Sequence, residues 1–299
     1  MSRLSDQELI EELQKRFDEN GRTIQELKEL TEELKVVNKK LEESEALKSH
    51  FISNITNEII NPFTSILGLS RNILAVKKED WKRVISMVAL IHSEAFNLDF
   101  QLRNIFVAAK IEAGEIYPEI LNVDLGNMVR SVIESFKIEA KKKSLELEFN
   151  FDMLPEKNNN VYFKTDPEKL KLAIANLISN SIKYSNEDSK VVVSVWKSED
   201  ENVNFSVQDF GQGISDANQK IIFDRFKRLD SGINSLNRGH GLGLSINKAV
   251  IDLLQGSIDV KSELGKGATF TLSIPEAKTN IAGFSADGNE FLFDEDEVF

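Results

Sequence analysis

One glycine-rich stretch, Asn237–Asn247, most constrains how this chain can fold. It reads Asn-Arg-Gly-His-Gly-Leu-Gly-Leu-Ser-Ile-Asn, and an apolar pattern of helical period follows it directly. Glycine lets a backbone take positive φ and come close to a ligand. The N-terminus of a helix offers free N–H groups and a positive dipole end, which suits a polyphosphate. The stretch therefore predicts a phosphate-binding loop that opens into a helix.

The spacing of these glycines differs from two common phosphate-binding motifs. The dinucleotide-binding motif has two residues between its second and third glycines, and the P-loop ends in Gly-Lys-Ser/Thr. Single residues separate the three glycines of this chain. An ordinary tight turn explains a lone glycine loop equally well, so the prediction of a nucleotide site depends on other motifs.

Composition argues against several classes of function. The 299 residues allow two or three structural units, and 41% apolar residues support a hydrophobic core. A net charge of −12 argues against nucleic acid as the main partner. The lack of cysteine excludes disulfides, and the three histidines are too scattered for a zinc site. Without a signal region or a run of about 18 apolar residues, we expect a cytoplasmic chain with no membrane span. A longer parent protein with an upstream sensor part stays possible.

Residues 1–48 are predicted to form a coiled-coil signalling helix. Their apolar positions alternate in steps of three and four residues. Two successive steps of three, Ile24 to Leu27 to Leu30, interrupt the repeat and would overwind a coiled coil locally. An imperfect, solvated helical spacer is the simpler explanation of this irregularity, and a helix with two registers is the alternative.

Residues 49–115 are predicted to form an antiparallel helical hairpin. The apolar seam continues past Pro62, which should kink the helix, and a polar gap over residues 77–80 precedes a second helical pattern. That pattern runs from Trp81 to about Ala113. A two-helix hairpin cannot bury its own seam, so we expect a homodimer that forms a four-helix bundle.

From residue 116 to residue 276 the pattern alternates between helices and strands. Asp124 and Asp166 are predicted helix caps, and Pro167 stands at the first turn after the second cap. Alternating apolar residues predict strands near 145–151, 191–196, 203–207, 257–262 and 268–274. These elements predict an α/β sandwich with helices on one face of a single mixed sheet. The acidic tail, residues 277–299, is predicted to be disordered, and docking of its aromatic residues is the alternative.

The helix after Asp166 carries one group of candidate ligand-binding residues. Asn176 and Asn180 lie four residues apart and share a helix face. Amides on the inward side of an apolar helix need a partner, and a Mg²⁺–phosphate cluster would be one. At the end of the same helix, Lys183 can reach a phosphate and Tyr184 can stack near a purine.

Asp209 carries a second group, because it ends a strand and precedes two glycines. Its carboxylate can accept a hydrogen bond from an adenine amino group, and the glycines let the backbone pass close to the base. Phe226 lies in a segment that we expect to be a mobile lid, and Thr269 follows two glycines at the start of the last strand. Each motif alone has an ordinary structural explanation, but all four in this order favour a nucleotide pocket. The candidate nucleotide-binding residues are Asn176, Asn180, Lys183, Tyr184, Asp209, Gly211, Gly213, Phe226, Gly239, His240, Gly241, Leu242, Gly243, Leu244 and Thr269.

Residues 46–275 resemble the catalytic core of the two-component sensor histidine kinases. The order of motifs matches the family's dimerisation and phosphoacceptor hairpin, followed by its N, G1, F, G2 and G3 boxes. The resemblance implies a Bergerat-type ATP-binding domain of the GHKL type and a response-regulator receiver domain as partner. It also implies that Asn180 is the Mg²⁺ ligand, that Lys183 contacts a phosphate and that Asp209 accepts the adenine amine. Gly239, Gly241 and Gly243 then correspond to the lid glycines, and His240 to a lid residue between them.

Two positions depart from related patterns. Gyrase- and Hsp90-like hydrolases have a Glu four residues before the metal-binding Asn, where this chain has Asn176, so transfer to another acceptor is favoured over hydrolysis. The family's phosphoacceptor motif is Phe-x-x-x-x-Ser/Thr-His-Glu-x-x-x-Pro, and Asn57 takes the place of the histidine. An imidazole offers a lone pair to the γ-phosphorus while Glu58 would take its other proton, but an amide lone pair is tied up in resonance. His50 lies about two helical turns away, too far to substitute without movement of the ATP-binding domain. We therefore predict ATP·Mg²⁺ binding without autophosphorylation at position 57.

Several roles are compatible with this combination. Asn57 could be an introduced substitution in an otherwise ordinary kinase, or the natural protein could be a pseudokinase that acts as an ATP-sensitive dimer. A third role is dephosphorylation of a response regulator, because the resemblance places a water-orienting Thr or Asn three residues after Glu58, and Asn61 occupies that position. A coiled-coil adaptor that uses the fold only as a scaffold is the last alternative, although a scaffold need not keep Asn180 and Asp209.

Overall fold

The computed structural model describes residues 6–76, 80–153, 161–223, 242–278 and 284–285. The chain divides into two compact units, Met1–Ser53 and Asn54–Phe299. No helix among the described residues is both long and apolar enough to cross a lipid bilayer.

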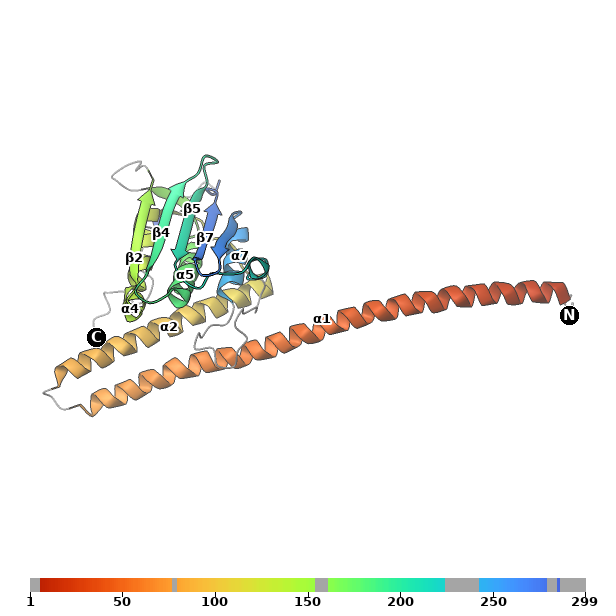
Figure 1. Ribbon diagram of the computed structural model, residues 1–299, viewed down its shortest axis with the longest axis horizontal. Helices are drawn as coiled ribbons and strands as arrows, with labels where there is room; N and C mark the ends of the chain where they lie inside the picture. The colour runs from red at the N-terminus through yellow and green to blue at the C-terminus, as the bar shows by residue number, and fades with distance from the viewer. Residues whose placement is uncertain (1–5, 77–79, 154–160, 224–241, 279–283, 286–299) are drawn as a thin grey trace. The chain divides into compact units, whose positions relative to one another are not determined.

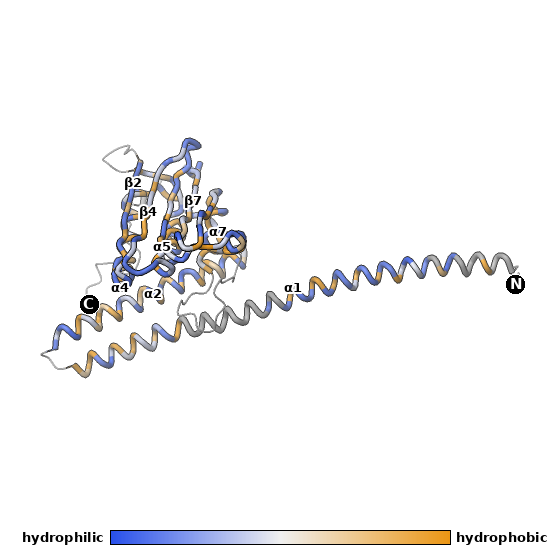
Figure 2. The backbone as a smooth tube through the Cα atoms, in the orientation of Figure 1, coloured by the Kyte–Doolittle hydropathy of each residue, from blue (hydrophilic) through white to orange (hydrophobic). Residues whose placement is uncertain are grey.

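Helix α1 spans Asp6–Leu74 and contains most of the first unit. Its predicted seam is open in the single chain, since Ile24, Leu27 and Leu30 are each more than half exposed. Figure 2 shows apolar and polar residues alternating along this part of the helix. An exposed seam of this kind is what a coiled-coil partner would bury, and the coiled coil stays a prediction. Pro62 lies inside the helix, which continues to Leu74.

Helix α2 spans Trp81–Ala113, so the predicted break between two helical segments is confirmed. It ends at Gly114, whose left-handed conformation lets its N–H reach the carbonyl of Ile111. Four buried residues of α2 recur at steps of three or four and therefore share one face. They are Ser93, Phe96, Phe100 and Asn104, and the buried Met87 lies off this face. Other apolar residues of α2, such as Ile85 and Phe106, stay more than half exposed in the single chain.

A five-stranded mixed sheet forms the centre of the second unit (Figure 1). Its strand order is β2-β4-β5-β7-β6, with β2 parallel to β4 and the other neighbours antiparallel. All five strands lie where the alternating pattern predicts them. Their bounds are Glu146–Asp152 for β2, Lys190–Lys197 for β4, Val203–Asp209 for β5, Ser257–Glu263 for β6 and Gly267–Ile274 for β7.

Helix α5, Pro167–Tyr184, is the central element of the core. It contacts β4 and β5 on one side and helices α3 and α7 on the others. Every residue from Leu170 to Ile178 is buried, and each fully buried aliphatic side chain contributes about 1.5–3 kcal/mol. The remaining helices of this unit are α3, Leu125–Ser135; α4, Lys137–Lys142; α6, Asp216–Gln219; and α7, Gly243–Leu253.

Both predicted helix caps are confirmed. Asp124 accepts a hydrogen bond from the N–H of Asn127 at 3.1 Å and begins α3. Asp166 accepts from the N–H of Lys169 at 3.0 Å, and Pro167 follows it in the first turn of α5. A side-chain acceptor at this position satisfies one of the free donors of a helix start, which explains why both helices begin there.

The prediction of a single sheet is wrong, because a second sheet has the order β3-β1-β8. Strands β1, Leu121–Asp124, and β3, Tyr162–Thr165, have four residues each and pair antiparallel. Strand β8, Phe284–Ser285, pairs parallel with β1. Disorder is therefore a wrong prediction for these two tail residues, and docking of the tail on the chain itself is what is found for them. Strands this short show too few alternations for a sequence pattern to reveal them.

Candidate functional site

Asp209 is the last residue of β5 and is buried. Its Oδ1 accepts hydrogen bonds from the N–H groups of Gly211 at 3.0 Å and Ala268 at 3.3 Å. Burial raises the pKa of this carboxyl group, and these two hydrogen bonds oppose the rise. No such hydrogen bond from a described residue reaches Oδ2. The side chain is thus held by one oxygen, and the other can accept a hydrogen bond from a ligand.

Close backbone packing explains the glycines around Asp209. A Cβ at Gly211 would lie 2.0 Å from the carbonyl oxygen of Tyr184, and one at Gly267 would lie 2.0 Å from that of Asp209. Gly267 also has a φ of +84°, which other residues rarely adopt. Gly213 is similar, with a φ of +71° and the carbonyl of Glu263 as its close neighbour. The end of α5, the end of β5 and the start of β7 meet here with no room for side chains.

The last turn of α5 brings Lys183 and Tyr184 next to this junction. The Nζ of Lys183 lies 5.1 Å from the centre of the Tyr184 ring, a cation–π distance. Ser185 forms an isolated antiparallel bridge with Gly211, and Nδ2 of Asn186 donates to the carbonyl of Phe210 at 2.9 Å. The structure therefore joins two of the predicted motifs, the end of α5 and the turn after Asp209.

Lys143 fixes the same turn, and sequence reasoning missed it. Its Nζ donates to the carbonyls of Ile182 at 3.0 Å, Lys183 at 2.6 Å and Ser185 at 3.5 Å. A cation at the C-terminus of a helix satisfies free carbonyls and favours the helix dipole. The sequence gives no signal for this role, because Lys143 is the last of three consecutive lysines.

Asn176 is buried, and its amide has partners within the protein. Its Nδ2 donates to Oδ1 of Asn104 at 2.9 Å and to Oδ1 of Asn247 at 3.0 Å. The prediction that this amide needs a metal–phosphate partner is therefore wrong for Asn176. Asn104 of α2 and Asn247 of α7 accept its hydrogen bonds instead. Asn104 was also missed, and Asn247 could have been found, since it is an amide in an otherwise apolar helix pattern.

Asn180 lies one turn further along the same face of α5 and is only partly buried. Its amide takes part in no hydrogen bond with another described residue. An amide oxygen in this state can serve as a ligand of a hard cation such as Mg²⁺. Of the two predicted amides, Asn180 is therefore the one that stays available to a ligand.

Helix α7 begins at Gly243, as the glycine-rich stretch predicts. Leu242 precedes it and is buried, while Gly243 packs so that a Cβ there would lie 3.4 Å from the Asn176 side chain. Leu244 is in the first turn, and Thr269 is opposite Gln208 in the β5–β7 ladder. Leu244 and Thr269 thus lie in the helix and the strand that the sequence predicts for them.

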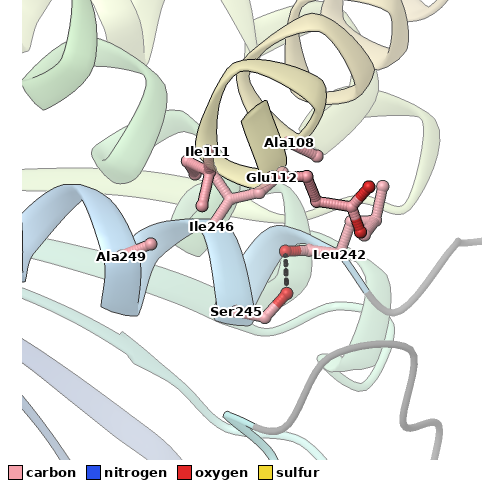
Figure 3. Close-up of a pocket in the computed structure, with 7 residues that line it drawn as sticks. All are labelled: Ala108, Ile111, Glu112, Leu242, Ser245, Ile246 and Ala249. Atoms are coloured by element: carbon pink, nitrogen blue, oxygen red, sulfur yellow. Dashed lines mark hydrogen bonds between the residues drawn. The ribbon is translucent and has the colours of Figure 1, made fainter. Parts of the chain in front are cut away.

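A small pocket lies between α2 and the start of α7 (Figure 3). It leaves about 20 Å³, enough for about one water molecule, so it is not a nucleotide site. Ser245 closes one side by donating to the carbonyl of Leu242 at 2.9 Å. The lining residues are Ala108, Ile111, Glu112, Leu242, Ser245, Ile246 and Ala249.

Some predicted site residues lie outside the described part of the chain. These are Phe226, Gly239, His240 and Gly241, together with the side chains of Asn57 and Glu58 in α1. Asn61 is described and is exposed on α1.

Comparisons with known proteins agree with this geometry. Residues 165–278 match the family of histidine kinase-, DNA gyrase B- and HSP90-like ATPases. The sensor histidine kinase GacS of Pseudomonas protegens is 30% identical over 276 residues, which cover 90% of this chain and 29% of that protein. The circadian input-output histidine kinase CikA of Synechococcus elongatus is 29% identical over 238 residues, 77% of this chain and 30% of that protein. The chain thus spans about 30% of the length of these curated relatives.

A solved structure shares the fold. The full-length structure of ShkA in complex with AMPPNP has a TM-score of 0.53 at 24% identity and covers 79% of this chain and 47% of that chain. The position of the match places the ATPase domain on α5, β4–β7 and α7. The domain match and the curated relatives together support a sensor histidine kinase catalytic core in this chain.

Proposed function

We propose that this chain is the ATP·Mg²⁺-binding core of a two-component phosphorelay kinase that cannot phosphorylate itself at position 57. The observation that carries the nucleotide part is the Asp209 carboxylate, with Oδ1 held by two backbone donors and Oδ2 left as an acceptor. The observation that carries the second part is the amide of Asn57 at the phosphoacceptor position.

The residues of the site fit an adenine nucleotide. Asp209 accepts a hydrogen bond from the adenine amino group. Tyr184 lies beside the turn that would run past the adenine base. Lys183 is the cation of α5 that lies nearest to the Tyr184 ring. Asn180 offers its amide oxygen to Mg²⁺, and the ion, when bound, neutralises charge on the phosphates.

Transfer of the γ-phosphoryl group needs a nucleophile that Asn57 does not provide. A histidine at this position would use a ring nitrogen lone pair, while Glu58 takes the proton from the other nitrogen. The amide nitrogen of asparagine has no such lone pair. ATP should therefore bind without forming phosphohistidine on this chain.

Two measurements test the proposal. Titration calorimetry with ATP and MgCl₂ should show binding, and binding should be lost in the Asp209→Ala variant. Incubation with γ-labelled ATP should leave no acid-labile, base-stable phosphate on the unaltered chain. A chain that does not bind ATP, or one that forms robust phosphohistidine, would contradict the proposal.

The Asn57→His variant separates an arrested kinase from a pseudokinase. Autophosphorylation and transfer to a response-regulator aspartate in this variant would mean that Asn57 alone blocks an otherwise complete kinase. Inactivity of a variant that still binds ATP would favour a pseudokinase, an ATP-dependent dimer that regulates a partner. The hairpin and coiled coil would supply the homodimer, since their apolar positions are exposed in the single chain.

Dephosphorylation of a response regulator is the second candidate. Glu58 and Asn61 keep the acidic and amide positions that this reaction needs, and Asn61 is exposed to a partner. The chain should then speed the loss of phosphate from a phosphorylated receiver domain. The Asn61→Ala variant should lose this effect while its ATP affinity stays unchanged.

A further inference from the structure

Three buried asparagines from three helices meet at the back of the candidate site. Asn104 comes from α2, Asn176 from α5 and Asn247 from α7, and their exposed fractions are 3%, 3% and 0%. Nδ2 of Asn176 is the centre, because it donates to Oδ1 of each of the other two. We call this group the asparagine cluster.

The cluster is almost completely paired. Nδ2 of Asn104 donates to the carbonyl of Phe100 at 3.0 Å, and Nδ2 of Asn247 donates to the carbonyl of Ala173 at 2.9 Å. An amide group buried without a partner costs about 1–3 kcal/mol, so each member depends on the others. Apolar residues would fill such a space without this dependence. A network of buried amides that are hydrogen-bonded to one another instead favours one relative position of its helices.

The cluster touches the nucleotide site at two points. Asn176 packs against Gly243, the first residue of α7, and its Nδ2 lies 3.5 Å from the Gly243 carbonyl oxygen. It is also one helical turn before Asn180, the proposed Mg²⁺ ligand. A shift of Asn176 would therefore move both the end of the glycine-rich loop and the metal-binding turn.

We infer that Asn104 and Asn247 are positioning residues for nucleotide binding, which act through Asn176. The Asn104–Asn176 hydrogen bond joins α2 to α5, the helix that carries Asn180. The position of α2 therefore affects the position of Asn180. The Asn104–Asn176 hydrogen bond and binding of the nucleotide phosphates then favour each other, as linkage requires. The inference rests on the proposed nucleotide binding.

The Asn104→Leu variant tests the inference, with Ser93→Ala as its matched control. Ser93 also joins α2 to the domain, through a 2.6 Å hydrogen bond from Lys142, but it has no contact with Asn176. Calorimetry with AMPPNP and MgCl₂ should show a dissociation constant about fivefold higher for Asn104→Leu, as expected for one lost hydrogen bond. The Ser93→Ala variant should bind as the unaltered chain does.

Hydrogen exchange on the unaltered chain provides a test that needs no variant. Adding AMPPNP and MgCl₂ should slow exchange of the α2 amides around Asn104. Three results would overturn the inference. The Asn104→Leu variant could bind AMPPNP as tightly as the unaltered chain, both variants could lose the same affinity, or exchange of the α2 amides could stay unchanged. If the unaltered chain bound no AMPPNP at all, the proposed function would be wrong and the inference would fall with it.

Discussion

Replacing Glu139 with glutamine should reduce the pH dependence of stability that this chain shows near neutral pH. Glu139 lies in α4 against α2, and burial raises its pKa from 4.5 to about 7. Glu94 of α2 raises it further, whereas Lys142 and a hydrogen bond with Asn97 lower it. Its Oε1 is buried without a hydrogen-bond partner.

The sign and size of the effect follow from this pKa. Because the folded state raises the pKa, Glu139 stabilises the fold fully below pH 4.5, and that stabilisation is lost as the pH rises through about 7. One pKa unit corresponds to about 1.4 kcal/mol, so the whole effect is about 3 kcal/mol. Between about pH 5.5 and about pH 8 the linkage relation gives a loss of about 2 kcal/mol.

Urea unfolding followed by circular dichroism at these two pH values measures the loss. The Glu134→Gln variant is the control, because Glu134 is exposed and paired with Lys137 on the same side of the domain. The control should keep the pH dependence of the unaltered chain, and Glu139→Gln should lose about 2 kcal/mol of it. The same pH dependence in Glu139→Gln as in the unaltered chain would refute the reasoning.

Three further substitutions test the adenine end of the site. Lys143→Met should lower the free energy of unfolding by about 2 kcal/mol in urea denaturation, because three carbonyls lose a charged donor, and the exposed Lys141→Met should not. Gly267→Ala should cost at least about 2 kcal/mol, since its Cβ would meet the Asp209 carbonyl, and a neutral result would contradict the packing. Asp209→Asn should raise the dissociation constant for ATP about tenfold in calorimetry, through loss of a charged acceptor. The exposed Asp259→Asn should leave it unchanged.

Local patterns predicted the parts of the fold that local forces decide. A capping aspartate, an alternation of apolar residues or a glycine before a helix acts within a few residues, so Asp124, Asp166 and Gly243 could be assigned from the sequence. Strands β1, β3 and β8 have only two to four residues and gain their place through pairing with distant segments.

Contacts between distant residues explain what the sequence could not show in the site. The burial of Asn176 pointed correctly to a partner, but the partners are Asn104 and Asn247, more than 70 positions away in either direction. A phosphate-bound metal ion and a neighbouring helix satisfy an amide equally well, and only the packing of α2 distinguishes them. Lys143 acts across 40 positions, from the end of α4 to the end of α5.

The two ends of the candidate site are supported in different ways, and this difference has a measurable consequence. At the adenine end, Asp209 is held by backbone N–H groups of the sheet and its adjoining turns. At the phosphate end, Asn180 and Gly243 depend on helices α5 and α7, and through Asn176 on α2. Loss of the Asn104–Asn176 hydrogen bond should therefore weaken the binding of phosphates and leave the binding of the base intact. The Asn104→Leu variant should bind adenosine as the unaltered chain does and bind AMPPNP with MgCl₂ more weakly. Equal weakening for both ligands would mean that α2 supports the whole domain rather than its phosphate end.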